Sequence, residues 1–248
     1  RQRQMCIRDR NSTTQVNLSS HTPSVRFEWH ATNPFPPPAD LIVNTTSGTS
    51  DFIPGQLHTN NTSDIISYTD TVRAITTIGA SCPGAPFPYH FIINPTPKIS
   101  GPYNLTICSR DSFNVNPTDA PPTTIVPLGT NYTWVVIDSV FIEGASNQTI
   151  PQLSIGQRLR NTSNIPRFVK YQVTPRSGIS DPISIADSCE GSSFFVIVTV
   201  NPAPEFPSMY DTICSGQSFD TIPVNNTNSI PPFIVPSGTL YHWIEPIM

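Results

Sequence analysis

The chain has 248 residues, of which 12% are charged and 28 are proline, and its formal net charge is −4. Ordinary globular domains contain about twice the share of charged residues and about half the share of proline. Long amphipathic helices are therefore excluded, because proline ends helices and too few charges remain for their solvated faces. The stretches between the prolines are rich in Thr, Val, Ile, Tyr and Phe, which favour strands. The composition predicts an all-β protein.

Residues 1–10 read Arg-Gln-Arg-Gln-Met-Cys-Ile-Arg-Asp-Arg, which resembles the translation of a transposase adapter from sequencing libraries. Such a segment says nothing about the fold. Without it the net charge changes from −4 to −7, because four arginines and one aspartate leave, and the odd fifth cysteine also leaves. We interpret this basic segment as adapter-derived, and we predict no nucleic-acid partner.

A segment of the chain occurs twice, about 107 residues apart. The first copy contains Cys82, residues 91–97, residues 107–109 and Trp134, and the second contains Cys189, residues 198–204, residues 213–215 and Trp243. Around Trp29 and at residues 61–63 the chain also resembles the segments around Trp134 and at residues 161–163. The period is too long for a solenoid unit and suits an independently folding domain.

These repeats predict the domain organisation. After the adapter-like residues 1–10 we expect one module at 11–97 that lacks its first strands, a complete module at 98–204, and the start of a third module at 205–248. The Asn-Pro-x-Pro segments at 94–97 and 201–204 lie between modules, and their alternate prolines favour an extended linker.

The complete module can be read as a series of short strands. We expect them at residues 103–108 (an edge strand), 112–116, 132–138, 167–174 and 194–200. Phe113 and Val115 share one face at period two, as do Val169, Tyr171 and Val173. The run at 194–200 is the most apolar in the chain, and such a run can be buried on both faces.

Three tryptophans recur at one module position and are expected to anchor the cores: Trp29, Trp134 and Trp243. A strand tryptophan between two sheets buries a large apolar surface. The strands that should face the third module's apolar residues do not occur within residues 205–248. We therefore expect Phe219, Ile234, Tyr241 and Trp243 to lack an opposing sheet.

Three spaced motifs carry a resemblance to a known family: Ile-Cys-Ser-Gly-Gln-Ser-Phe at 213–219, Pro-Ser-Gly-Thr-Leu-Tyr-His-Trp at 236–243 and Val-Thr-Val-Asn-Pro-Ala-Pro at 198–204. They resemble the PKD-like repeats of large secreted proteins of gliding-type Gram-negative bacteria, which often end in a gliding-associated or type IX sorting domain. The resemblance covers nearly all of residues 20–248. It implies tandem immunoglobulin-like, PKD-like Greek-key β-sandwiches, secreted or at the cell surface, and no catalytic residues. Arg110 replaces the family glycine, which leaves the geometry of its turn open.

Besides Cys6 the chain has four cysteines, and their even number and regular placement suggest disulfides in an oxidising compartment. Within the complete module only Cys108 and Cys189 are available, and joining them would stabilise the fold by roughly 4 kcal/mol. We predict this pair. The alternatives, Cys82 with Cys108 and Cys189 with Cys214, stay open because Cys108 and Cys189 could lie at opposite poles of a sandwich.

The sequence contains no nucleophile elbow, phosphate-binding loop, zinc-protease motif or calcium loop. The five histidines do not recur at matching positions, as a repeated metal site would require: His21, His30, His58, His90 and His242. We therefore expect no enzyme activity, no cofactor and no metal. Asn-x-Ser/Thr sequons are frequent, including one at Asn161, as expected in a chain rich in these residues.

Two functions remain. The first is a non-catalytic structural or adhesive spacer that projects other domains from the cell, with neighbouring repeats, and also surface glycans or cell-surface proteins, as partners and no direct membrane insertion. The second is an accessory carbohydrate-binding module of a secreted polysaccharide-degrading enzyme, with the tryptophans as a sugar platform. A shared position in every module favours core tryptophans and hence the spacer.

Overall fold

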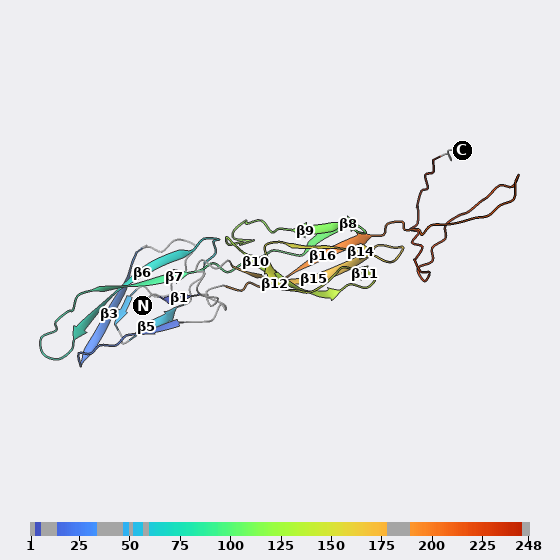
Figure 1. The fold of residues 1–248 in the computed structure, drawn as a ribbon. Helices are drawn as coiled ribbons and strands as arrows, with labels where there is room; N and C mark the ends of the chain where they lie inside the picture. The colour runs from blue at the N-terminus through green and yellow to red at the C-terminus, as the bar shows by residue number, and fades with distance from the viewer. Residues whose placement is uncertain are drawn as a thin grey trace. The chain divides into compact units, whose positions relative to one another are not determined.

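The computed structural model describes residues 3–5, 14–33, 47–49, 52–56, 60–177 and 189–244, which form strands and connecting loops (Figure 1). Within this described part of the chain, no helix is long and apolar enough to cross a membrane. The chain divides into two compact units. The first consists of Arg1–Ser100, Pro117–Tyr132 and Thr174–Ser193, and the second of Gly101–Asn116, Thr133–Val173 and Phe194–Met248.

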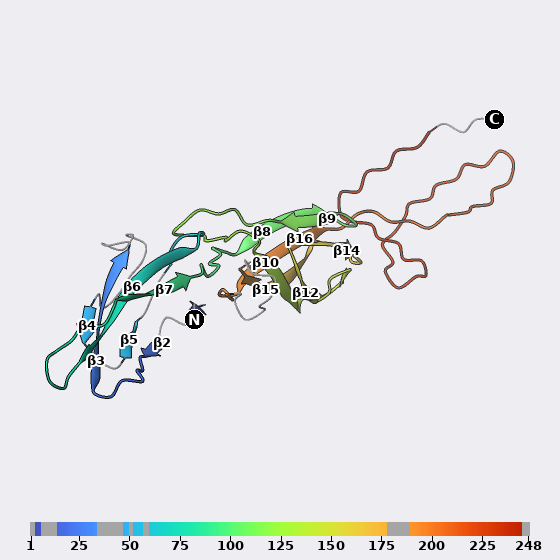
Figure 2. The same cartoon turned by 60° about the vertical axis from the view of Figure 1, so that its left-hand side comes forward.

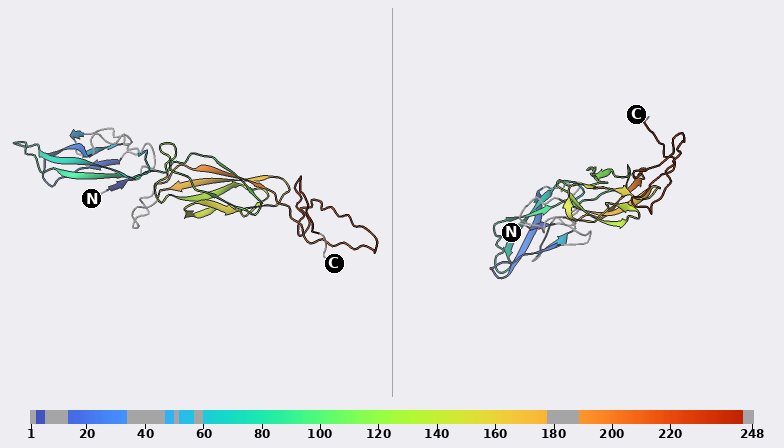
Figure 3. Two further views of the ribbon diagram at one scale, coloured as in Figure 1. Left: turned by 90° about the horizontal axis from the view of Figure 1, so that it is seen from above. Right: turned by 45° about the vertical axis from the view of Figure 1, so that its right-hand side comes forward.

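The first unit contains a five-stranded sheet. Its strands are, in spatial order, β1 (Arg3–Met5), β7 (Phe87–Ile93), β6 (Ile66–Thr76), β3 (Val25–Asn33) and β4 (Ser47–Thr49). All neighbours are antiparallel except β1 and β7, which are parallel. A separate ribbon pairs β2 (Thr14–Asn17) with β5 (Phe52–Gln56). The left view of Figure 3 shows β6 and β7 side by side, as their pairing requires.

The strand β1 lies within the adapter-like start of the chain. Met5 pairs with Ile93 as Ile107 pairs with Val200 in the second unit. Without a neighbour on this side, β7 would present an edge of unpaired N–H and C=O groups, and an extended peptide of almost any sequence can satisfy such an edge. The peptide at β1 thus occupies the place that the first strand holds in the second unit.

The core of the first unit consists of Phe27, Trp29, Val72 and Ile93, with Leu18, Val25, Ile66, Ala74 and Tyr89 packed against it. On β3 the buried Phe27 and Trp29 alternate with Arg26 and His30, which are exposed. This alternation at period two explains why the segment forms a strand with one face in the core.

A carboxyl group lies among these apolar side chains. Asp70, on β6, is 2% exposed, and its Oδ2 atom has no hydrogen-bond partner in the described structure. Burial penalises the charged form and raises the pKa of the Asp70 carboxyl from 3.8 to about 6. The ionised carboxylate is therefore a destabilising feature of the first unit at neutral pH.

We expect Asp70→Asn to stabilise the first unit in a pH-dependent way. Because the folded-state pKa is raised, Asp70 contributes stability only while protonated, and this contribution is lost as the pH rises through about 6. At about 1.4 kcal/mol per pKa unit the wild-type loss amounts to about 3 kcal/mol at neutral pH. Hydrogen exchange of β6 and β7 from pH 4 to pH 8 measures the difference. Exposed Asp64→Asn is the control, and a gap between Asp70→Asn and wild type that stays constant with pH would contradict the prediction.

The second unit contains a second five-stranded sheet. Its strands are, in spatial order, β12 (Gln148–Gln152), β10 (Asn131–Asp138), β15 (Arg167–Arg176), β16 (Phe194–Asn201) and β8 (Tyr103–Cys108). β15 and β16 are antiparallel, whereas β16 and the edge strand β8 are parallel. Two short ribbons accompany the sheet, β9 (Ser112–Val115) with β13 (Ile155–Arg158) and β11 (Ile142–Glu143) with β14 (Arg160–Asn161). Figure 2 shows β9 close to β8.

The five-stranded sheet packs face to face on the β9–β13 ribbon. Tyr171 of β15 is fully buried, and its ring lies 5.6 Å from that of Phe113 on β9. Its hydroxyl donates a hydrogen bond to Oε1 of Gln157 on β13 (2.9 Å), and burial raises its pKa. These contacts join two layers across one core, so the unit is a β-sandwich.

The structure confirms the all-β sandwich prediction and the five expected strands of the complete module, including the edge position of β8. The strands β11 to β14 were not predicted, because they are short and lie in a Ser- and Asn-rich stretch. Residues 194–200 are buried on one face, whereas the other face is half-buried or exposed. On that second face Phe195 is 39% exposed, and the ammonium of Lys170 lies 4.0 Å from its ring centroid.

Residues 205–244 contain no strand, only isolated bridges such as the one between Glu205 and Ile234. Phe219, Tyr241 and Trp243 are exposed there, as expected without an opposing sheet. The expectation for Ile234 is wrong, since it is fully buried. The backbone N–H of Ile234 donates to Glu205 O, and the N–H of Glu205 donates to Ile234 O. These two bonds hold Ile234 beside the segment that leaves the second sheet.

Candidate functional site: the charged exit of the second repeat

The exit of the second repeat is the end of the sheet at which Asn201 leaves β16. An asparagine side chain organises it: Asn161 is 1% exposed, and its Nδ2 donates to the carbonyl oxygens of Ile165 and Val200, at 2.8 Å each. Its Oδ1 accepts hydrogen bonds from the backbone N–H and the hydroxyl of Ser163, also at 2.8 Å. The amide thus fixes the loop after β14 to the last residues of β16.

The first unit contains the same arrangement at Asn60. Its Nδ2 donates to Asp64 O (2.7 Å) and Ile93 O (3.2 Å), and its Oδ1 accepts from the backbone N–H and the hydroxyl of Thr62. The sequence comparison had matched residues 61–63 with 161–163, and this alignment is wrong by one residue. Asn60 is the structural counterpart of Asn161.

A group of charged side chains surrounds the exit. The guanidinium of Arg160 donates to Glu143 (2.7 Å) and, through Nη2, to both carboxylate oxygens of Glu205 (3.0 and 3.2 Å). Arg110 also contacts the Glu205 carboxylate, at 2.6 Å. Hydrogen bonds to Glu143 and Glu205 raise the pKa of Arg160, so it stays charged. Glu205 follows the Asn-Pro-Ala-Pro segment, so two arginines of the repeat hold the residue that ends its linker.

The backbone at Arg110 is unusual. Its φ of 76° lies in the left-handed region, which costs a non-glycine residue about 1–2 kcal/mol. In the third copy Gly216 occupies this position with φ 87°, and both turns are closed by the same bond, from Asp111 N to Cys108 O and from Gln217 N to Cys214 O. Arginine at 110 therefore keeps the turn that glycine makes in the third copy. Its guanidinium reaches Glu205, which glycine could not do.

A hollow of about 300 Å³ lies beside this group, lined by Arg110, Glu143, Gly144, Arg158, Leu159 and Arg160. Arg158 Nε donates to Arg110 O (2.7 Å), which further fixes the strained turn. The hollow contains hydrogen-bond donors and one carboxylate but no nucleophile beside a base. Among the described residues no cluster of His, Cys, Asp or Glu could hold a metal ion. The chemistry of this group is the binding of the chain's own linker.

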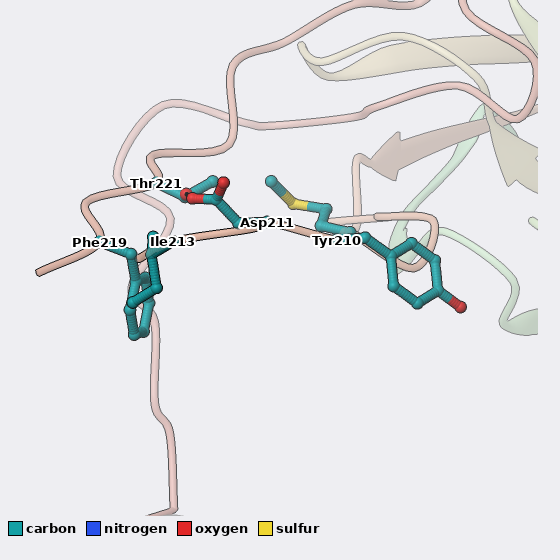
Figure 4. Close-up of a pocket in the computed structure, with 6 residues that line it drawn as sticks. Tyr210, Asp211, Ile213, Phe219 and Thr221 are labelled. Atoms are coloured by element: carbon teal, nitrogen blue, oxygen red, sulfur yellow. Dashed lines mark hydrogen bonds between the residues drawn. The ribbon is translucent and has the colours of Figure 1, made fainter. Parts of the chain in front are cut away.

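A larger hollow of about 670 Å³ lies in the third copy, lined by Met209, Tyr210, Asp211, Ile213, Phe219 and Thr221. Figure 4 shows Phe219 beside Ile213, with Tyr210 directed away. Phe219 is 70% exposed, whereas its counterpart Phe113 is 4% exposed beneath Tyr171. Two of the lining residues, Phe219 and Thr221, thus correspond to the core residues Phe113 and Val115, so the hollow does not indicate a ligand site.

The three tryptophans differ in exposure. Trp29 and Trp134 are buried, 3% and 4% exposed, whereas Trp243 is 81% exposed. Trp134 Nε1 donates to Ser146 O at 3.2 Å, while Trp29 Nε1 has no partner in the described structure. Buried indole rings cannot stack on a sugar, so Trp29 and Trp134 do not form a carbohydrate platform.

The predicted disulfide between Cys108 and Cys189 is wrong. Cys108 is a free, exposed thiol, as are Cys82 and Cys214, whereas Cys189 is bonded to a partner outside the described residues. Cys108 pairs with Asn201 at the end of β16, and Cys189 precedes the start of that strand. Eight residues of strand span roughly 23 Å, while a disulfide needs Cα atoms within about 7 Å. The same free thiols exclude both adjacent-copy alternatives. His21, His30 and His242 are exposed, and His58 lies outside the described residues.

One domain family and several solved structures are similar to this chain. Residues 105–204 match the family model of the PKD-like domain. No curated protein is significantly similar to the chain. Mouse cadherin-23 EC22-24 is 11% identical with a TM-score of 0.33 and covers 79% of this chain, which spans 62% of that structure. Human CDH23 EC21-23 is 14% identical with a TM-score of 0.32, over 91% and 82% of the two chains. The fibronectin(III)-like modules of Clostridium thermocellum CbhA are 11% identical with a TM-score of 0.26, and the likeness covers 81% of this chain and 93% of that structure.

These structural likenesses are too weak to add to the assignment. The family model matches a segment that includes β15, β16 and the exit residues Arg110, Glu143 and Arg160, and that ends one residue before Glu205. Residues 105–204 are thus similar to the PKD-like domain family.

Proposed function

We propose that the chain is a non-catalytic structural and adhesive spacer of a secreted or cell-surface protein, built from modules at 11–97, 98–204 and 205–248. It projects other domains from the cell, and its partners are neighbouring repeats and surface glycans or proteins. A gliding-type bacterial source and a sorting domain elsewhere in the protein belong to the same proposal. The observation that carries it is the way in which the linker residue Glu205 is held.

Glu205 is bound from both directions along the chain. Arg110 and Arg160 of the second repeat hold its carboxylate, while its backbone bonds that of Ile234 in the third copy. At the preceding linker, Lys98 makes the same two backbone bonds with Ile125. A linker residue fixed to the repeats before and after it resists rotation, which a spacer needs and which a free-standing binding module does not.

The preceding prolines support this role. Asn201-Pro202-Ala203-Pro204 and Asn94-Pro95-Thr96-Pro97 favour extended, semi-rigid backbone. The carbohydrate-binding alternative depended on exposed tryptophans, and Trp29 and Trp134 lie in cores. The spacer is therefore the better supported proposal.

Small-angle scattering of the full chain tests the proposal. A compact globule of this length has a radius of gyration of roughly 18 Å, whereas two modules of about 13 Å each, joined end to end, give about 24 Å or more. We expect the larger value, and Glu205→Ala should increase it or broaden the distance distribution by freeing the linker. Glu28→Ala is the matched control, because it removes a carboxylate that pairs with Arg26 within the first unit and does not contact the linker at Glu205. A value near that of a compact globule would refute the spacer proposal.

A further inference from the structure

The free cysteine of the second repeat lies at its exit. Cys108 ends β8 and pairs in register with Asn201, and Ser109 N donates to Asn201 O at 2.8 Å. Its thiol is exposed and unbonded. Asn201 begins the Asn-Pro-Ala-Pro linker, so this thiol stands where the chain leaves the repeat.

The bonded cysteine lies at the entrance. Cys189 is 1% exposed. Its backbone N–H donates to the hydroxyl oxygen of Ser177 (2.8 Å), and its carbonyl oxygen accepts from the backbone N–H of Ser177 (2.9 Å). Two residues later, Gly191 approaches the linker that enters the repeat so closely that a Cβ atom there would lie 2.1 Å from Pro97 O. Cys189 is therefore held beside the incoming linker, and its bond leads to a residue outside the described part of the chain.

The next entrance is built in the same way. Lys98 and Ile125 exchange two backbone hydrogen bonds at the first linker, and Glu205 and Ile234 do so at the second. Cys82 and Cys189 are themselves 107 residues apart. A complete repeat after Pro204 would thus carry its own entrance cysteine beside Pro204, as Cys189 stands beside Pro97.

We propose that Cys108 forms a disulfide with the entrance cysteine of the following repeat, the residue that corresponds to Cys189. The two thiols lose two protons and two electrons to a disulfide-bearing thiol oxidoreductase of the exporting compartment, whose own disulfide is reduced to two thiols. The bond spans the Asn-Pro-Ala-Pro linker and ties successive repeats together.

Distance favours this pairing over one within a repeat. The three residues from Asn201 to Pro204 span at most roughly 10 Å, which the turn at Ser109 and the loop before the entrance cysteine can bridge. Within a repeat, β16 separates the two cysteines by roughly 23 Å. The pairing also explains why Cys108 and Cys214 are both free here, since neither is followed by a further entrance cysteine in the described chain.

The test uses the full chain with a second copy of residues 98–204 inserted after Pro204. The inserted copy carries Cys108→Ser, so that one Cys108 remains, and Ser192→Ala, a change at an exposed residue that marks its entrance peptide by mass. The protein is exported into an oxidising compartment, its free thiols are alkylated in denaturant, and the peptides are mapped without reduction. We expect Cys108 to be linked to the marked Cys189 peptide.

Two controls complete the test. Cys214→Ser should leave the linked peptide unchanged, and replacing the remaining Cys108 by serine should abolish it. Cleavage of the linker provides a second readout, because the two repeats should separate on a gel only after reduction. Alkylated Cys108, or Cys108 linked to any other cysteine, overturns the proposal. The inference rests on the spacer proposal only in that a further repeat follows residue 204. Peptide mapping of the disulfide is independent of the small-angle scattering of the chain, so either proposal can fail alone.

Discussion

Replacing Trp134 by alanine is expected to lower the free energy of unfolding of the second repeat by about 3–5 kcal/mol. The side chain is 4% exposed on β10, an interior strand of the sheet, so its removal leaves a large cavity, and Ser146 O loses the indole donor. Hydrogen exchange of β15 and β16, followed by mass spectrometry, measures the loss in the intact chain. The amides of β6 and β7 should keep their protection.

The chain supplies matched controls for this prediction. Trp243→Ala should have almost no effect, because Trp243 is 81% exposed. Substitution by phenylalanine separates the contribution of the indole hydrogen bond from that of packing. Trp134→Phe removes the hydrogen bond to Ser146 O, whereas Trp29→Phe removes an N–H that has no partner in the described structure. Equal losses at positions 134 and 243, together with fluorescence quenching that a glycan relieves, would contradict the core assignment and favour a sugar platform.

Asn161→Ala is expected to destabilise the second repeat by about 1–3 kcal/mol. The substitution removes the amide donor from the buried carbonyl oxygen of Val200, and an unsatisfied buried group costs about 1–3 kcal/mol, whereas the carbonyl oxygen of Ile165 keeps the hydroxyl of Ser163 as a donor. The exit should open first, so the amides around Asn201 should exchange faster than those at the start of β16. Hydrogen exchange resolves this gradient along a single strand.

Two variants separate the parts of this effect. Asn161→Asp keeps an acceptor for Ser163 but removes both donors and buries a charge, so it should be at least as damaging as alanine. Asn60→Ala should reproduce the loss in the first unit and leave the second unchanged, since Asn60 makes the equivalent bonds there. If Asn161→Ala is silent while Asn60→Ala is not, the two asparagines do not have a common role.

The sequence predicted the long strands well because their burial follows a period of two. Phe113 with Val115, and Val169 with Tyr171 and Val173, are buried as their alternation indicates. The strands β11 to β14 carry no such period, since β12 is exposed along almost its whole length and β13 has a single buried residue, Ile155. Their positions depend on tertiary contacts such as the bond from Gln157 to Ser146.

The exit group could not be predicted because its parts are distant in sequence. Arg110, Glu143, Arg160 and Glu205 come from four separate segments, and only the observation that Arg110 replaces a family glycine drew attention to any of them. The cysteine pairing was predicted wrongly for a related reason. The chain-entropy estimate depends only on the length of the loop between Cys108 and Cys189, and it does not include the fact that β16 separates the two ends of that loop.

The hydrogen bonds of Asn161 also bear on the choice of a host for producing the protein. Asn161-Thr162-Ser163 is a glycosylation sequon, and the atom to which a glycan would be attached, Nδ2, already donates to two carbonyl oxygens, of which that of Val200 is buried. An oligosaccharide added at this nitrogen before folding would have no room beside β16 and would displace both bonds. A eukaryotic secretory pathway that modifies Asn161 would therefore yield misfolded protein, whereas a bacterium without this modification would not.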